Sequence, residues 1–264
     1  MRTRAAFDRL SCPRDPVTLA RVLAAATLLA TFASVADAQR SGSGEGYLFQ
    51  EPTARLSIRG GYTVARAGSD LFADLTDQFI LSKRDFNAFS IGAEGGYQVA
   101  PRVELSVSVD YAGARSPSEY RRLVDNDDLP IEQTTRFERV PIMGNARISL
   151  LPRGRRIGRL AWIPARVVPW VGAGAGAVWY RLQQVGDFVD VGTNEVAFDE
   201  LGSDGWTFGG QAMAGADVGV TPHVALTVDV RSTWARAALG RDYSGYERLD
   251  LSGVNATLGF TYRF

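Results

Sequence analysis

The last seven residues of the 264-residue chain, LGFTYRF at positions 258–264, decide the fold. Apolar and polar residues alternate through this stretch, which ends on an aromatic residue. Strict alternation is typical of a β-strand whose two faces lie in different surroundings. The ends of soluble domains, by contrast, are usually polar and poorly ordered. The stretch therefore predicts a strand that is paired up to its last residue, with Leu258, Phe260, Tyr262 and Phe264 on one face.

The same alternation recurs upstream, so that the sequence predicts eight strands in total. Their ranges are 55–64, 89–99, 103–111, 140–150, 168–182, 206–220, 224–234 and 254–264. Each is long enough to cross a bilayer at a tilt, which takes about 9–11 residues. Segment 168–182 is the least clear, because both of its faces carry small or apolar residues. There we expect Val168, Trp170, Val178, Tyr180 and Leu182 on the apolar face and Arg181 on the polar face.

The connections between these strands alternate in length. Tight turns at 100–102 and 221–223 contrast with connections of roughly 12 to 25 residues on the other side, and a basic link at 151–167 breaks the rule. Aromatic residues gather near both ends of the strands, as at the two surfaces of a membrane. They are Tyr62, Phe89, Tyr111, Tyr180, Trp206 and Trp234 on the loop side and Tyr97, Trp170, Tyr262 and Phe264 on the turn side.

These patterns predict an all-β fold, an eight-stranded antiparallel up-and-down transmembrane β-barrel over residues 55–264. A secreted soluble barrel or sandwich is the alternative, and it would fill its apolar face with bulky side chains. Here many apolar-face positions are Gly or Ala, and the opposite face carries charges of both signs, which favours the membrane barrel. No stretch beyond the N-terminal region runs 18 apolar residues, so the sequence predicts no transmembrane helix.

The N-terminal region has the order of a secretory signal peptide over residues 1–38. Arginines at 2, 4, 9, 14 and 21 precede the apolar run VLAAATLLATFASVA, and small residues at Ala36 and Ala38 mark a cleavage site. The sole cysteine, Cys12, lies in this leader, so the exported chain has no disulfide framework. Residues 39–54, rich in Gly and Ser, are expected to form a flexible periplasmic lead-in.

The inward face of the predicted barrel is rich in charge. It carries Arg59, Glu94, Asp110, Arg147, Asp217, Asp229 and Arg231, with Glu104 and Arg181 in addition. The burial of an ion that has no partner of opposite charge costs about several kcal/mol. We therefore expect a lumen charge network that plugs the barrel; a gated or narrow channel is the alternative.

Other motifs give weak support for chemistry. GAGAGA at 172–177, with Asp190 downstream, imitates a dinucleotide fingerprint but lacks the following helix. DNDD at 125–128 lacks the glycine and final glutamate of a calcium loop. The single histidine, His223, falls in a turn, so histidine-based catalysis and metal binding are unsupported. We expect no catalytic, cofactor or metal site, and a balanced net charge gives no indication of nucleic-acid binding.

The long connections contain many acidic residues, which we interpret as a solvated surface. Weak binding of divalent cations, which would bridge to lipid phosphates, is the sharper alternative. The residues are Asp70, Asp74, Asp77, Asp85, Asp125, Asp127, Asp128, Asp187, Asp190, Glu195, Asp199 and Glu200.

The leader, the alternating strands, VPWVGAGAGAVWY at 168–180 and above all LGFTYRF resemble the outer-membrane β-barrel proteins of the OmpA/OmpX type, the porin family of Gram-negative bacteria. The resemblance implies that Leu258, Phe260, Tyr262 and Phe264 form an insertion signal that the barrel assembly machinery reads. It also implies location in the cell outer membrane, with outer-membrane lipids and lipopolysaccharide as neighbours. The usual short turn is replaced here by the basic link at 151–167.

The sequence is compatible with three functions. The first is a non-enzymatic, monomeric barrel with a structural or surface-interaction role through its long acidic extracellular loops. The second is a narrow-pore channel for small solutes, and the third is a lipid-modifying enzyme at the barrel rim.

Overall fold

The computed structural model describes residues 46–124, 129–158, 161–189 and 196–264. The predicted signal peptide and the first half of the predicted lead-in lie outside these residues. Within the described part of the chain, no helix is long and apolar enough to cross a membrane.

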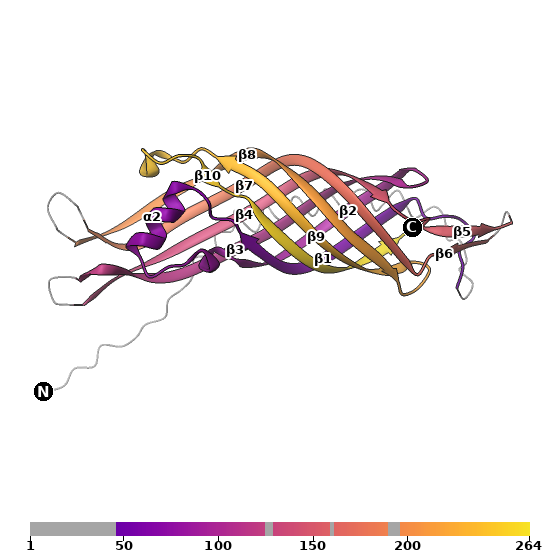
Figure 1. Cartoon of the computed structure of the whole chain (residues 1–264), viewed down its shortest axis with the longest axis horizontal. Coiled ribbons are helices and arrows are strands. Elements are labelled where there is room, and N and C mark those ends of the chain that lie inside the picture. Colours follow the sequence, from indigo (N-terminus) through magenta and orange to yellow (C-terminus); the bar gives the residue numbers. More distant parts are fainter. Residues whose placement is uncertain (1–45, 125–128, 159–160, 190–195) are drawn as a thin grey trace, which may run out of the picture. The chain divides into compact units, whose positions relative to one another are not determined.

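Eight long strands form one closed antiparallel ring (Figure 1). In chain order they are β1 (Ala54–Ala65), β2 (Ala88–Ala100), β3 (Val103–Val124), β4 (Pro130–Ser149), β7 (Val167–Val189), β8 (Val196–Gly219), β9 (Val224–Ala237) and β11 (Gly253–Arg263). Each pairs with the next, and β11 pairs with β1 from Arg55↔Arg263 to Ala65↔Gly253. The ring therefore has no free edge, and the predicted eight-stranded barrel is confirmed.

Four strands are much longer than the sequence indicated. β3, β4, β7 and β8 run for 22, 20, 23 and 24 residues, and most of the two connections between them is strand, not loop. Pairs such as Ser116↔Thr135 continue the ladder beyond the ring. Our expectation of long loops here was wrong, because charged and polar residues interrupt the apolar outer face of these extensions, whereas apolar residues such as Ile131 and Phe137 lie on the inner face, so the alternation of a membrane strand is absent.

The remaining connections at this end, the loop end, contain short elements. α2 (Asp70–Gln78) and η2 (Lys83–Phe86) join β1 to β2, whereas η3 (Arg241–Tyr243) and β10 (Leu249–Asp250) join β9 to β11. Figure 1 shows α2 beside the projecting ends of β3 and β4, at the end opposite the C-terminus.

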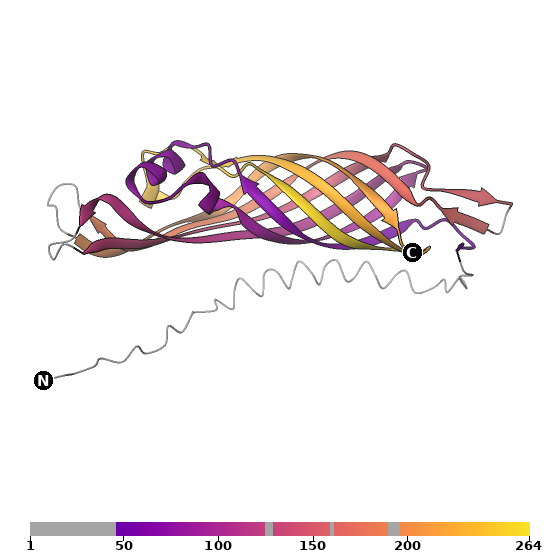
Figure 2. The same cartoon turned by 60° about the horizontal axis from the view of Figure 1, so that its bottom comes forward.

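The opposite end, the turn end, carries a small hairpin made of β5 (Gly154–Ile157) and β6 (Ala161–Pro164), which projects beyond the barrel in Figure 2. This hairpin is the predicted basic link. Leu48 pairs with Trp162 of β6 through two backbone hydrogen bonds, of 2.9 and 2.7 Å. Leu48, in the described half of the expected lead-in, is thus hydrogen-bonded to the hairpin.

Side chains alternate across the barrel wall as predicted in seven of the eight ring strands. Ile58, Phe89 and Phe208 are 62%, 83% and 86% exposed on the outside, whereas the polar residues between such positions are buried inside.

The faces of β7 are the reverse of our expectation. Trp170, Val178, Tyr180 and Leu182 are buried inside together with Val168, and Arg181 lies outside with its guanidinium 5.4 Å from the ring centroid of Trp179. Trp170 and Tyr180 are consequently not girdle residues.

The reversal has a steric reason. Gly172, Gly174 and Gly176 share the inward face, where a Cβ on Gly176 would lie 2.0 Å from the carbonyl oxygen of Ile142. The inner face needs glycine for this close approach, and the alanines therefore face outward. A shift of one residue exchanges the two faces completely.

Candidate functional site in the barrel interior

The interior near the turn end holds five arginines and five carboxylates, whose formal charges cancel. They are Arg55, Arg59, Arg147, Arg231 and Arg263 with Glu94, Glu104, Asp110, Asp217 and Asp229, all buried. We call this set the lumen network. The ten residues come from seven ring strands, because charged side chains occupy the inward positions of every strand except β7.

Glu94 is the centre of the lumen network. Its side chain is fully buried, and Arg55, Arg59 and Arg231 each form an ion pair with it. The Nη1 atom of Arg59 lies 2.7 Å from Oε2, and Nη2 of Arg231 lies 2.5 Å from the same oxygen. Arg147 stands further off, with Nη1 at 4.0 Å. Four cations around one carboxylate offset the cost of burying its charge.

The other carboxylates hold the arginines in fixed orientations. Arg59 binds Asp110 through two parallel hydrogen bonds, from Nε at 3.0 Å and Nη2 at 2.6 Å. Arg231 donates from Nε to Asp229 at 2.8 Å. The two-point contact between Arg59 and Asp110 matches the planar fork of the guanidinium and fixes its geometry. The arrangement is a rigid, neutral network across the lumen.

The turn end of the lumen is covered by an aromatic side chain. The guanidinium of Arg147 lies 3.7 Å from the ring centroid of buried Trp170, and its Nη2 is 3.1 Å from Asp217. Next to it, Thr227 donates to Asp217 at 2.8 Å and lies within 2.7 Å of the hydroxyl of Thr261. Polar side chains and the indole thus lie in contact at this level of the barrel.

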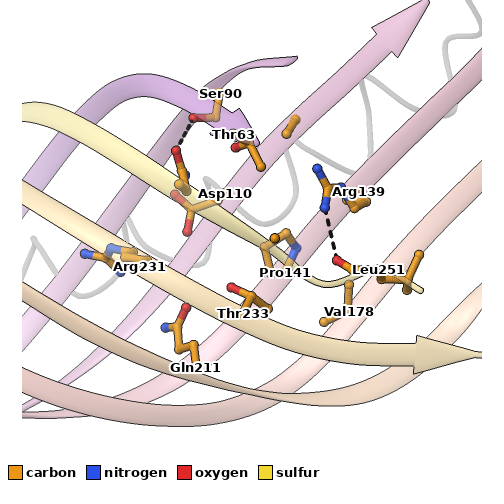
Figure 3. Close-up of a pocket in the computed structure, with 13 residues that line it drawn as sticks. Thr63, Ser90, Asp110, Arg139, Pro141, Val178, Gln211, Arg231, Thr233 and Leu251 are labelled. Atoms are coloured by element: carbon orange, nitrogen blue, oxygen red, sulfur yellow. Dashed lines mark hydrogen bonds between the residues drawn. The ribbon is translucent and has the colours of Figure 1, made fainter. Parts of the chain in front are cut away.

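Above the lumen network lies a small cavity of about 40 Å³ (Figure 3). Its lining includes Asp110, Arg231, Gln211 and Arg139. Arg139 donates from Nη1 to the carbonyl of Leu251 at 3.0 Å, drawn as a dashed line in Figure 3. A single water needs about 10–15 Å³ by this measure, so the cavity has room for only a few waters.

The loop end contains a cluster of buried apolar side chains, which we call the apolar cap. It includes Leu71, Phe72, Leu75, Phe86, Phe137, Val178, Tyr180, Leu182, Tyr243, Leu249 and Leu251. The ring centroid of Phe72 lies 4.7 Å from that of Phe86 and 5.4 Å from that of Phe137, both in edge contacts. Residues of α2 and η2 are therefore packed onto the inner face of the long strands.

The connections of the apolar cap also cover the edges of the long strands. Along β3, Ile80 donates its backbone N–H to Glu119 at 2.8 Å, and Arg121 donates from Nε to Phe79 at 2.7 Å. Along β8, the N–H of Gly240 donates to Ser203 at 2.8 Å, and the hydroxyl of Tyr243 donates to Leu201 at 3.4 Å. Covered edges do not offer a template for pairing with another chain.

The seven charged residues singled out from the sequence all lie in the lumen network. Arg55 was missed, although it stands two positions before Ser57 and shares its inward parity. The role of Trp170 was also missed, because β7 was given the wrong faces.

The four residues of the expected insertion signal lie on the outer surface of β11 and just after it. Leu258, Phe260, Tyr262 and Phe264 are all exposed. The rings of Tyr262 and Phe264 are 4.9 Å apart, and His223 stacks on Tyr262 at 5.7 Å. His223 lies in the turn before β9, with Nδ1 3.0 Å from the carbonyl oxygen of Arg263.

The sequence motifs that gave only weak support for chemistry have the following places in the structure. GAGAGA lies within β7, paired with β4 and β8. Asp190 and the DNDD segment lie outside the described residues. In the ranges that the structure describes, no three His, Cys, Asp or Glu residues are grouped so that they could hold a metal ion.

Comparison with known proteins adds a family match. A family model described as outer membrane protein beta-barrel domain matches residues 23–264. No curated protein matches the chain.

Three solved structures are similar to the chain at low identity. Neisserial surface protein A is 16% identical, with 80% of this chain and 96% of that chain covered and a TM-score of 0.42. OprG from Pseudomonas aeruginosa is 14% identical, with 81% and 97% covered and a TM-score of 0.43. Ail of Yersinia pestis, solved with a heparin analogue, is 14% identical, with 80% and 99% covered and a TM-score of 0.40.

Proposed function

The chain belongs to the outer membrane protein beta-barrel domain family, and from this membership we propose that it is a closed, non-enzymatic barrel whose role is structural or adhesive. In this proposal residues 1–38 direct export and are removed. The turn end faces the periplasm, and the loop end presents a binding surface to the outside. The barrel works as a monomer among outer-membrane lipids and lipopolysaccharide, after insertion by the barrel assembly machinery.

The observation that supports the proposal is the presence of two buried clusters in the interior. The buried charged side chains of the lumen network lie near the turn end, and the buried apolar cap lies near the loop end. Open diffusion channels are built from wider barrels, with about 16–18 strands. A solute that crossed this barrel would have to separate ion pairs and displace a packed apolar cluster.

The surface offered at the loop end includes the two projecting hairpins, β3–β4 and β7–β8. Between positions 181 and 205 the sequence has six acidic residues and one arginine, Arg181. The other connections at this end are closer to charge balance, so the acidity noted in the sequence is concentrated in the β7–β8 hairpin. Paired strands hold the described part of it in a fixed shape, which favours a surface-interaction role.

Conductance across planar lipid bilayers tests the proposal. The purified full chain should give no unitary current steps, with a large porin in the same bilayer as positive control. A second variant, in which a short Gly-Ser linker replaces residues 70–86, removes much of the apolar cap and leaves the lumen network. It should stay silent as well, because the network alone blocks the lumen. Regular unitary steps from the unmodified chain would contradict closure and favour the narrow-pore function.

The enzymatic alternative is tested in cells. Deletion of the protein should leave the lipid A and phospholipid profiles unchanged. A change restored by the unmodified chain would favour a lipid-modifying activity at the rim.

A further inference from the structure

We propose that the outer wall of the barrel carries a binding site for the phosphate group of a membrane lipid, formed by Arg66, Arg236 and Arg248. The inference rests on the proposed outer-membrane location and names one lipid contact that this location requires. The occupant is a phosphorylated lipid whose acyl chains lie against the barrel wall.

The three arginines meet at one surface groove, although they come from separate segments. Arg66 follows β1, Arg236 belongs to β9, and Arg248 immediately precedes β10. The pairing of β10 with β9, through Asp250↔Arg236 and Leu249↔Ala237, brings the last two together. The groove is lined by Arg66, Thr207, Phe208, Trp234, Ala235, Arg236, Arg248 and Ser252.

The groove has an excess of positive charge. None of its lining residues is acidic. A second depression adjoins it, shares Arg236 and Arg248, and is bordered by Glu247 and Asp250. Asp250 is buried and accepts hydrogen bonds from the backbone N–H groups of Gly68 at 3.2 Å and Ser252 at 3.0 Å. Its carboxylate is therefore largely engaged by the backbone.

The arginines of the groove differ from those of the lumen in their partners. Every arginine of the lumen network has a carboxylate within 4.0 Å. In the groove, Arg66 stands 3.9 Å from Asp250, and its side chain is 65% exposed. Arg236 and Arg248 are exposed, and neither has an ion pair with another described residue. Two guanidinium groups are thus available to an anion.

Apolar side chains lie next to the arginines, on the side toward the turn end. They indicate that the anion belongs to a lipid. Trp234 precedes Arg236 by two residues in β9, so both side chains point outward, about 6.6 Å apart along the strand. Trp234 is half exposed and Phe208 is almost fully exposed. Aromatic side chains in such positions lie at the boundary between acyl chains and head groups.

This order of side chains matches the order of groups in a phosphorylated lipid. Acyl chains would contact Phe208 and Trp234, and the phosphate would lie one step further out, between the guanidinium groups. Arginine is well suited to this position, because its planar fork donates two hydrogen bonds to a phosphate at once. A free phosphate or an acidic peptide would leave the aromatic side chains without a partner.

Binding of lipid A to the full chain in a mild detergent tests the site. Its affinity should fall by roughly tenfold or more in R66Q/R236Q/R248Q, because three charged donors lose their charge. The matched control is R115Q/R122Q/R241Q, which neutralises three exposed arginines elsewhere at the loop end and should change the affinity by less than about twofold.

Two further probes identify the source of the phosphate. Lipid A from which the phosphates have been removed should bind the unmodified chain and R66Q/R236Q/R248Q equally weakly. Inorganic phosphate should not compete at the concentration of lipid A that saturates the site. The F208A/W234A variant should weaken binding of lipid A too, because its acyl chains lose their contacts.

Equal affinity of the unmodified chain and R66Q/R236Q/R248Q for lipid A would overturn the proposal. Competition by inorganic phosphate at similar concentrations would also overturn it, since the site would then recognise a free anion. All substituted side chains are exposed, and heat-modifiable gel migration verifies that each variant is folded. Conductance tests the closed barrel separately, so either proposal can fail while the other stands.

Discussion

Arg147 and Trp170 form a stacked pair inside the barrel, with the guanidinium 3.7 Å from the centroid of the indole ring. Arg147 is on β4 and Trp170 on β7, and the pair covers the lumen network at the turn end. Both side chains are buried. The pair therefore links the lumen network to β7, the ring strand that contributes no charged side chain to this network.

Replacement of Trp170 by alanine should destabilise the protein by about 3–5 kcal/mol, because a large buried aromatic group is lost and its cation–π contact with it. Urea unfolding in lipid vesicles measures the change in free energy. The W170F variant keeps most of the buried area and should lose less. If Trp170 faced lipid, as its sequence pattern suggested, W170A would change stability by under about 1 kcal/mol and the inward placement would be contradicted.

Neutralisation of Glu94 should be among the most damaging changes in the interior. In E94Q the arginines around it would lose a shared negative charge and leave uncompensated cations, at a cost of about 3–5 kcal/mol. The same unfolding measurement applies, with E132Q as control because Glu132 is exposed on β4. A loss no larger in E94Q than in E132Q would show that the lumen network does not stabilise the barrel.

The apolar cap should loosen at alkaline pH. Burial, followed by the nearby Asp242 and Tyr246, raises the pKa of Tyr243 above its ordinary value of about 10. A raised pKa in the folded state means that the neutral phenol contributes stability below about pH 10, and this contribution is lost as the pH rises further.

Hydrogen exchange of residues 70–86 between pH 9 and pH 11, corrected for the intrinsic rate, follows this change. Protection should fall more steeply with pH in the unmodified chain than in Y243F, which has no proton to lose at this position. Burial also raises the pKa of Tyr120 and Tyr246, so both proteins will show some loss. Identical pH profiles would argue against a role for Tyr243.

Deletion of Phe264 should reduce assembly into the outer membrane, if the alternating C-terminal residues act as the insertion signal. The fraction of folded protein in outer-membrane preparations, seen by heat-modifiable gel migration, reports assembly. F208A is the matched control, since Phe208 is more exposed than Phe264 and lies outside the signal. Normal assembly of the deletion variant would contradict the insertion-signal interpretation.

Alternation alone was enough to predict the ring, because a membrane strand separates lipid from lumen with every residue. The same rule failed in β7, where Gly172, Gly174 and Gly176 alternate with alanines and the two faces hardly differ in polarity. What decides that case is steric: the inward glycines give room to side chains of β4, as with Gly174, where a Cβ would lie 2.0 Å from Oδ1 of Asn145. A contact of this kind between two strands cannot be recognised from the sequence of one strand alone.

The charges of the lumen network were predictable for the same reason as the ring, since parity along each strand determines which side chains face inward. Their pairing was not, because Glu94 receives arginines from β1 and β9, more than a hundred positions apart in the chain. The apolar cap was hidden as well. Its helix has only nine residues, and Phe72 finds its partner Phe137 through tertiary contact alone.

The long strands rise on one side of the barrel only. β4 and β7 remain paired as far as Gln133↔Gly186, whereas β1 ends at Ala65 and β11 starts at Gly253. The molecule consequently has a distinct front and back within the plane of the membrane. A neighbour that approaches β4 and β7 meets an upright sheet, and one that approaches β1 and β9 meets shorter strands. Contacts between neighbouring molecules would therefore depend on the angle at which each is rotated about the membrane normal.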